Sequence, residues 1–179
     1  MSDICVCDLV RTVEQDHSPT MLEYEGTIPS RYMVGTSQGH ILCCSRKAKT
    51  QKEIILSKYS AHYSSVRAVQ RNPIFPKSFL SAGDWSIKVW SEDLTVSPLL
   101  WVWAGQVRLT AATWSPARPS VIFASREDGC LLVLDILYKQ DGPLLTFNAH
   151  DGALTSLAVH HTGSLLCLGP LSSLPPSCK

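Results

Sequence analysis

Three side chains in the middle of the 179-residue chain carry the groups of a nucleophilic catalyst: His62, Ser81 and Asp84. A histidine held between a serine hydroxyl and a carboxylate can accept the hydroxyl proton and so turn the serine into a nucleophile. Trp90 follows Asp84 at the spacing expected for a tight turn and the strand after it. That spacing favours a structural interpretation, in which the four side chains form a buried hydrogen-bond network that ties the turn to the incoming loop. Each polar group of such a network would cost about 1–3 kcal/mol if it were buried alone.

Cysteine and histidine are common ligands of zinc, but their spacing in this chain does not fit the usual zinc sites. The close pairs are Cys5 with Cys7, Cys43 with Cys44, and His160 with His161. Zinc sites commonly separate paired cysteines by two to four residues, and adjacent histidines in a strand would point to opposite faces of the sheet. The motifs G-x-x-x-x-G-K, H-E-x-x-H and G-x-G-x-x-G are absent from the sequence. We therefore expect no enzyme activity, no metal and no cofactor.

Two short strands joined by a tight turn over residues 79–93 would position the candidate network. Gly83 and Asp84 suit the turn, since glycine tolerates a positive φ and aspartate can accept hydrogen bonds from nearby backbone amides. Ser81 would then lie in the first strand and Trp90 near the end of the second. The hairpin alone brings three of the four side chains near one another, and His62 must arrive from the preceding loop.

The same pattern recurs along the chain and indicates its architecture. Downstream, the matches at a spacing of 44 residues are Asp84 with Asp128 and Trp90 with Leu134, and His62 matches His150 at twice that spacing. Upstream, the matches at a spacing of 46 residues are Val34 with Leu80, Gln38 with Asp84 and Cys44 with Trp90. A unit of roughly 40–45 residues made of short strands is the size of a four-stranded propeller blade. The helical periodicity that an α/β fold needs between its strands is absent, so we predict an all-β propeller.

The repeats divide the chain into blades. We expect an N-terminal segment without a clear period at 1–19, blade one at 20–60, blade two at 61–105, blade three at 106–148, a partial blade four at 149–169 and an irregular Pro/Ser-rich tail at 170–179. The propeller would thus be incomplete, with about three blades and part of a fourth. The last strand of blade one is expected at 52–57. Blade three has Leu134 in place of the tryptophan, so we expect it to depend on apolar packing through Leu131, Val133 and Leu134.

The composition is that of a protein with a substantial core. Hydrophobic residues make up 45% of the chain and charged residues 17%, and the net charge is +1. A charge this close to zero argues against a nucleic-acid or anionic-membrane surface as the main partner. No secretory signal pattern or run of about 20 apolar residues is visible. The seven cysteines are therefore expected to be reduced thiols in the cytosol.

Four stretches of the sequence resemble the WD-repeat region of axonemal dynein intermediate chains, and most of all the second outer-arm type. They read LEYEGTIPSRYMVGTSQG from Leu22, SRKAK from Ser45, VQRNPIFPKSFLSAGDWSIKVWSED from Val69 and WSPARPSVIF from Trp114. The stretches occur in the family's order and lie between residues 22 and 137. The resemblance implies a WD40-type β-propeller, with His62, Ser81, Asp84, Trp90, Asp128 and His150 as its structural network residues.

The function implied by this resemblance is that of a non-catalytic scaffold. An intermediate chain of outer-arm dynein would dock the motor heavy chain, beside the companion intermediate chain and the light chains, for microtubule-based movement in the cilium. The expected location is the cytoplasm, the cytoskeleton and the axoneme of the cilium. The alternative is a WD-repeat adaptor of another ciliary or cytoplasmic complex. Neither function involves nucleic acid or a membrane.

Two groups of side chains are candidates for partner contact. Arg46, Lys47 and Lys49 belong to a basic cluster that could meet an acidic partner, although we favour a solvated loop, because exposed lysines also protect a sheet edge from wrong pairing. Trp85 stands beside the turn aspartate, and we expect it to point outward as a possible anchor. The other tryptophans are assigned to cores: Trp90 and Trp114 inside blades, and Trp101 and Trp103 packed between neighbouring blades.

Overall fold

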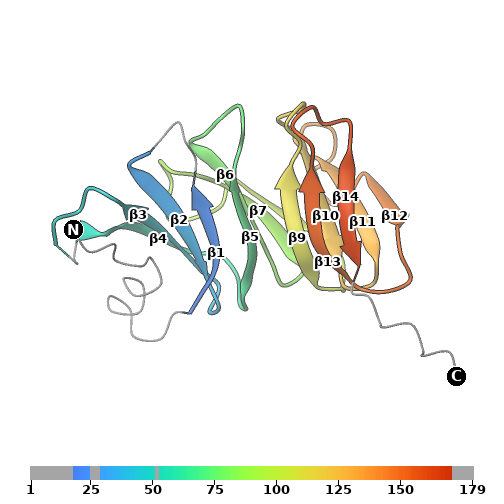
Figure 1. Cartoon of the computed structure of the whole chain (residues 1–179), viewed down its shortest axis with the longest axis horizontal. Helices are drawn as coiled ribbons and strands as arrows, with labels where there is room; N and C mark the ends of the chain where they lie inside the picture. The colour runs from blue at the N-terminus through green and yellow to red at the C-terminus, as the bar shows by residue number, and fades with distance from the viewer. Residues whose placement is uncertain (1–17, 25–28, 51–52, 171–179) are drawn as a thin grey trace, which may run out of the picture.

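The computed structural model describes residues 18–24, 29–50 and 53–170, and these form short antiparallel sheets (Figure 1). Blade one, as we call the first sheet, contains β1 (Pro19–Tyr24), β2 (Arg31–Thr36), β3 (His40–Ser45) and β4 (Ile55–Ser60) in that order. Blade two contains β5 (Val66–Arg71), β6 (Ser78–Gly83), β7 (Ser86–Ser91) and β8 (Leu100–Trp103). Blade three contains β9 (Leu109–Trp114), β10 (Val121–Arg126), β11 (Cys130–Asp135) and β12 (Leu145–Asn148). The fourth sheet pairs β13 (Leu154–Val159) with β14 (Leu166–Pro170).

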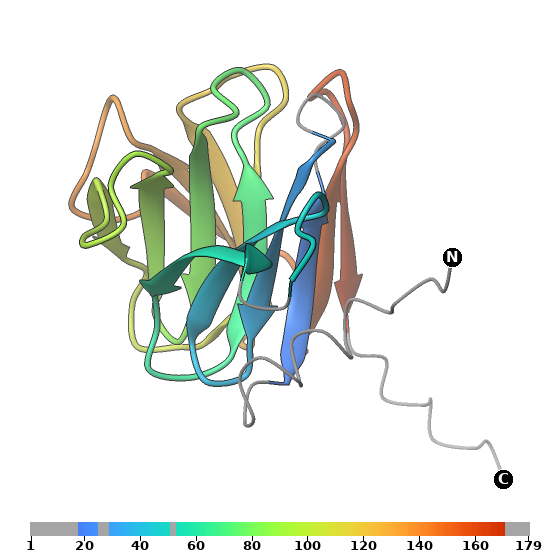
Figure 2. The ribbon, with the colours of Figure 1, turned by 90° about the vertical axis from the view of Figure 1, so that its left-hand side faces the viewer.

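The first strands of successive sheets lie next to one another: β1 beside β5, β5 beside β9, and β9 beside β13. Thr20 Oγ1 donates to Val66 O over 2.7 Å, and Gln70 Oε1 accepts from Trp114 N over 2.7 Å. These bonds join β1 to β5 and β5 to β9 at the inner side of the arc that Figure 2 shows from one end. The prediction of an all-β fold built from four-stranded blades, with part of a fourth, is therefore confirmed. Within the described residues the sheets do not close into a ring.

The strands of blade two alternate their side chains between its two neighbours, as the pleat requires. Ile87 and Val89 of β7 belong to the core shared with blade three, together with Trp114 and Leu132. Trp90 points the other way, into the core shared with blade one. The burial of Trp90 and Trp114, at 1% and 2% exposure, confirms their assignment to cores. Blade two thus buries both faces, which explains why its central strands β6 and β7 are buried at nearly every position.

The hairpin turns of the blades differ by one residue. The turns β2–β3 and β10–β11 have three residues each, and their last residues, Gly39 and Gly129, have φ angles of 85° and 81°. The β6–β7 turn has two residues, because Gly83 pairs with Ser86. Its first residue, Asp84, has a φ angle of 52°, the one positive value outside glycine in the described part of the chain.

Two sequence predictions about strand details were wrong. The last strand of blade one runs from Ile55 to Ser60 rather than over 52–57, a register that buries the ring of Tyr59 against Phe79 and Trp90. In blade three the fully buried pair is Leu132 and Leu134, whereas Leu131 and Val133 are half-buried. The side chains of β11 alternate, so only every second residue can face the core. Of the irregular segments predicted at 1–19 and 170–179, residues 1–17 and 171–179 lie outside the described residues, whereas Pro19 belongs to β1 and Pro170 to β14. No helix among the described residues has the length and apolarity needed to cross a membrane.

Candidate functional site

The side chains of His62, Ser81 and Trp90 form one hydrogen-bonded chain on the face of blade two that meets blade one. His62 Nε2 lies 2.9 Å from Ser81 Oγ, and Trp90 Nε1 donates to the same hydroxyl oxygen over 3.0 Å. Because the indole nitrogen can only donate, Ser81 accepts from Trp90 and can give its own proton to a neutral His62. His62 comes from the segment between β4 and β5, so the chain of bonds ties the loop that enters blade two to its two central strands.

Burial fixes the protonation state of His62. The side chain is 8% exposed, and desolvation, helped by the nearby charge of Lys88, lowers the pKa of His62 to about 4. Its Nδ1 is buried without a hydrogen-bond partner. The imidazole is therefore neutral at pH 7, and protonation would place an unpaired charge inside the molecule.

Asp84 binds the same loop through different atoms. Its Oδ2 accepts from Tyr63 N over 2.8 Å and from Ser64 N over 3.3 Å, and its Oδ1 accepts from the Ser64 hydroxyl. Burial alone would raise the pKa of Asp84, but the hydrogen bonds from Ser64 and Tyr63 outweigh it and hold the pKa below the ordinary value. The backbone carbonyl of Asp84 also accepts from Leu109 N over 2.9 Å, at the start of blade three. Asp84 thus binds both the loop that precedes blade two and the start of β9, the first strand of blade three.

This geometry does not suit a serine nucleophile. Ser81 is fully buried, and its hydroxyl already contacts both His62 and Trp90. Asp84 directs its carboxylate to the backbone of Tyr63 and Ser64, and in the described residues no hydrogen bond joins it to His62. A substrate could not reach the fully buried hydroxyl of Ser81, so the arrangement can hold the loop and the strands together but cannot carry out acyl transfer.

We expect Asp84→Ala to destabilise the protein by about 2 kcal/mol, because the change removes three hydrogen bonds to a charged acceptor and leaves an L-residue at positive φ. Urea denaturation followed by circular dichroism measures the loss. Asp84→Asn is the matched control, since asparagine tolerates this φ and keeps an acceptor oxygen; it should recover at least half of the stability. Equal stability of wild type and Asp84→Ala would contradict the role given to this side chain.

Blade three has the corresponding residues without the network. Asp128 forms an ion pair with Arg126 and accepts from Cys130 N over 3.2 Å. His150 is exposed, and its Nδ1 accepts from Gly152 N over 2.8 Å. Ser125 bonds Thr110 through their hydroxyls at 2.8 Å. Among the described residues no hydrogen bond joins the side chains of Asp128 and His150, and the two turns meet only through their backbones, where His150 N donates to Gly129 O over 3.2 Å. Blade three therefore depends mainly on its apolar core.

The tryptophans of β8 lie on the surface, contrary to the sequence prediction. Trp101 and Trp103 are 55% and 51% exposed, and Trp85 is 36% exposed. The rings of Trp85 and Trp103 stack with centroids 6.3 Å apart, and the ammonium of Lys88 lies 4.5 Å from the centroid of Trp101. β8 is the outermost strand of blade two, with β7 as its neighbour on one side and no further strand of the sheet on the other. We call Trp85, Trp101 and Trp103 the tryptophan surface.

The basic cluster lies in the loop between β3 and β4. Arg46, Lys47 and Lys49 are exposed, and Arg46 stacks over the ring of Tyr24 at 5.8 Å from its centroid. The loop position agrees with the solvated interpretation, and nothing in its geometry concentrates the charge on a concave surface.

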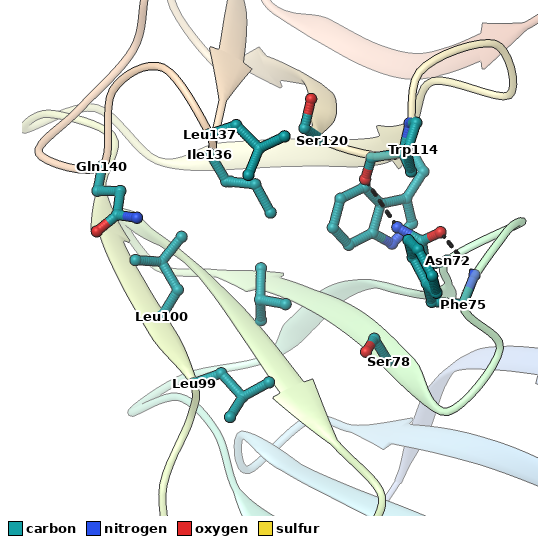
Figure 3. Close-up of a pocket in the computed structure, with 12 residues that line it drawn as sticks. Asn72, Phe75, Ser78, Leu99, Leu100, Trp114, Ser120, Ile136, Leu137 and Gln140 are labelled. Carbon is teal, nitrogen blue, oxygen red and sulfur yellow. Dashed lines mark hydrogen bonds between the residues drawn. The ribbon is translucent and has the colours of Figure 1, made fainter.

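A cavity of about 340 Å³ with a mostly apolar lining lies between blades two and three (Figure 3). It is at the opposite end of the strands from the Asp84 turn. Leu99, Leu100 and Ile136 form its floor and sides, and Asn72 closes one end by donating to Pro119 O over 2.8 Å. Phe75 and Leu137 at the rim are 60% and 82% exposed. A cavity of this size accommodates one or two apolar side chains of another molecule.

Sequence reasoning missed a cluster of charged side chains at the junction of blades one and two. The Arg71 side chain is 1% exposed and binds Glu92 over 2.5 Å, and Arg31 of blade one reaches the other oxygen of Glu92 over 3.3 Å. Glu23 of blade one accepts from Arg71 N over 2.9 Å. These four residues lie at distant positions in the sequence, and no spacing rule joins them. A buried arginine such as Arg71 requires a carboxylate partner, but the sequence does not indicate which one.

A G-x-S-x-G sequence at residues 35–39 was also missed. It is the signature of a nucleophilic serine only where a strand turns sharply into a helix. Here it lies in the turn between the antiparallel strands β2 and β3, where Ser37 N donates to Ser18 O over 2.8 Å. Its glycines serve packing: a side chain at Gly39 would collide with the backbone carbonyl of His62 at 1.9 Å.

In the part of the chain that the structure describes, no group of three or more His, Cys, Asp or Glu is close enough to hold a metal ion. Cys5 and Cys7 lie outside that part. Burial raises the pKa of Cys44 to about 12, so this residue remains a thiol and is a poor metal ligand. His160 and His161 lie in a turn after β13, where their ring centroids are 4.0 Å apart. They do not occupy opposite faces of a strand as the sequence suggested.

Comparison with known proteins places the chain in a family. Residues 11–164 match the model of the dynein axonemal intermediate chain 3 WD40 domain. The chain is 48% identical over 148 residues to the ciliary dynein intermediate chain 3 of Heliocidaris crassispina, and 38% identical over 170 residues to human dynein axonemal intermediate chain 2. It is 41% identical over 150 residues to the 70 kDa intermediate chain of the flagellar outer arm of Chlamydomonas reinhardtii.

These matches cover 83%, 94% and 83% of the chain but 25%, 28% and 26% of the three relatives. The chain therefore spans about a quarter of the length of the curated relatives. The match to the family model extends over all three blades and over β13, the first strand of the fourth sheet. The repeat, the sheet order and this match all indicate WD40 blades. The chain belongs to the dynein axonemal intermediate chain family and contains part of the WD40 domain of that family.

Proposed function

We propose that the chain is a non-catalytic scaffold subunit of axonemal outer-arm dynein, which docks the motor heavy chain beside a companion intermediate chain and light chains. The observation that carries this proposal is the match of residues 11–164 to the family model, together with relatives named as ciliary and flagellar outer-arm intermediate chains. The corresponding location is the axoneme of the cilium, where the complex would contribute to microtubule-based movement.

The described surface supports a docking role. Large apolar side chains are exposed in two separate places, the tryptophan surface on one face of blade two and the cavity between blades two and three. Exposed aromatic rings of this kind are the usual anchors of protein contacts. We infer that His62, Ser81, Asp84 and Trp90 keep the blade rigid between these two places, while Asp128 and His150 stabilise their own turns. The tryptophan surface, including Trp85, is then the better candidate for partner contact than Arg46, Lys47 and Lys49.

Affinity purification from ciliated cells tests the proposal. A tagged form of the chain is expressed, the cells are lysed gently, and the captured proteins are identified by mass spectrometry. Dynein heavy chain and a second intermediate chain should be enriched over a tag-only control. Enrichment of ciliary transport or ubiquitin-ligase subunits without a dynein heavy chain would contradict the proposal and favour a WD-repeat adaptor of another complex.

The same purification separates the two candidate contact regions. We expect the double variant Lys47→Gln/Lys49→Gln to capture the heavy chain as well as wild type, within about twofold, because exposed lysines at a solvated loop contribute little. Trp85→Ala/Trp103→Ala is the comparison, and its capture should fall clearly below that of wild type. A large loss with the lysine variant and none with the tryptophan variant would move the contact to the basic cluster.

A further inference from the structure

A cavity of about 210 Å³ lies between the tryptophan surface and the Asp84 turn. Trp85, Trp101 and Trp103 form its walls, Lys88 and His62 contribute to its inner end, and Tyr63, Asp84 and Ser86 complete the lining. Trp101 and Lys88 are directly paired across β7 and β8, as are Trp103 and Ser86, so these side chains share one face of the sheet. We call this space the Lys88 cavity.

Lys88 is a buried charge with spare hydrogen-bonding capacity. Its side chain belongs to a residue that is 8% exposed, and its ammonium group has three donors. Among the described residues it donates to one acceptor, Ala61 O, and it lies over the ring of Trp101. The nearest carboxylate, Asp84, is held by three donors from Tyr63 and Ser64 and forms no ion pair with Lys88 within the described chain. Burial lowers the pKa of Lys88 despite the nearby charge of Asp84, so within the described chain this ammonium lacks the ion-pair contact that buried charges usually have.

The lysine also departs from the pattern of the other blades. The residues that match Lys88 at the repeat spacings are Leu42 in blade one and Leu132 in blade three, and both are fully buried leucines. A leucine at this position of blade two would satisfy the packing without any charge to compensate. A residue that breaks a local rule without a structural gain is more often required by function.

We propose that the Lys88 cavity receives an acidic side chain from an extended segment of a partner protein, with the carboxylate bound to Lys88 Nζ and the flanking residues packed on the tryptophan rings. The spare donors of Lys88 fit a carboxylate. They also disfavour the other ligand that tryptophan rings attract, a cationic side chain, since Lys88 already occupies the face of Trp101. This inference concerns the chemistry of one cavity and holds whichever complex contains the chain.

Three pentapeptides test the proposal on the purified chain, with tryptophan fluorescence as the readout. Each has a central test residue between two phenylalanines and capped ends, and the central residue is glutamate, glutamine or trimethyl-lysine. The glutamate peptide should bind at least tenfold more tightly than either of the others. Equal binding of the glutamate and glutamine peptides, tighter binding of the trimethyl-lysine peptide, or no binding of the glutamate peptide at millimolar concentration would overturn the proposal.

Two variants locate the site. Lys88→Leu places at this position the residue found in the other blades, so the variant should fold, and circular dichroism can verify this. It should bind the glutamate peptide at least tenfold more weakly than wild type. Lys77→Leu removes a lysine whose side chain is 70% exposed and should bind within twofold of wild type. Unchanged binding by Lys88→Leu would overturn the assignment. The peptide comparison on the wild-type chain decides the matter without any variant, and neither test depends on the presence of dynein.

Discussion

Replacing Trp90 by alanine should lower the free energy of unfolding by about 3–5 kcal/mol, the cost of removing a large aromatic side chain from a closed core. The ring is 1% exposed. It lies against Tyr59 of blade one, with centroids 5.5 Å apart, and against Phe79 of its own blade, at 6.4 Å. The variant would also leave Ser81 without its donor. Since domains are commonly stable by only about 5–15 kcal/mol, this single change should bring the protein close to unfolding.

Thermal and urea unfolding, followed by circular dichroism, measure this effect. Trp90→Phe is the matched control, because it keeps most of the ring volume and loses the indole N–H; its cost should be about 1–2 kcal/mol. Trp101→Ala serves as a second control, since this ring is 55% exposed and its loss should change stability by less than about 1 kcal/mol. A Trp90→Ala protein as stable as Trp101→Ala would show that the core between blades one and two does not hold the molecule together.

Acid should destabilise the protein in a pH window set by His62. The pKa of this side chain falls from 6.5 to about 4 on folding, so the unfolded chain binds the proton more tightly than the folded one. The stabilisation from the neutral imidazole is complete above pH 6.5, declines as the pH falls, and is lost once the pH passes below about 4. A shift of this size corresponds to about 3 kcal/mol.

Urea titrations at intervals between pH 7.5 and pH 4 measure the slope. His62→Gln should be less stable at pH 7 but should lose much less stability on acidification, because the titrating group is gone. His150→Gln is the matched control: His150 is exposed, and the pH slope should stay that of wild type. An identical slope in wild type and His62→Gln would show that other groups cause the acid sensitivity.

The architecture could be predicted because it is repeated. Each blade places a turn residue and an apolar strand at nearly the same spacing, and the strands found at 66–71, 78–83 and 109–114 lie where the alternation of side chains requires them. The exposure of Trp101 and Trp103 could not be predicted in this way. Whether a strand residue is covered depends on how far the neighbouring blade extends, and that is a property of the assembled sheets rather than of β8.

The candidate site also has features that the sequence predicts and features that it does not. His62, Ser81 and Trp90 come together because two of them belong to one hairpin and the third enters from the adjoining loop. The contacts of Asp84 with the backbone of the loop depend on the two-residue turn and on the positive φ of Asp84. The repeat spacing of 44 residues does not indicate either feature, because it aligns this turn with a three-residue turn in blade three. Lys88 reads in the sequence as one polar residue in a strand, and only the packing of blade one against blade two shows that its charge is buried.

The links between the blades have a mechanical consequence. Within a blade, neighbouring strands are joined by ladders of backbone bonds, and a force along the strands must shear several of them at once. Between blades one and two, beside the shared apolar core, the polar connections are separate ones: Thr20 to Val66, Glu23 to the backbone of Arg71, and Arg31 to Glu92. A force that opens the angle between these blades would peel such contacts one after another. A load on this protein would therefore meet stiff resistance along the strands and weaker resistance at the junction between the blades.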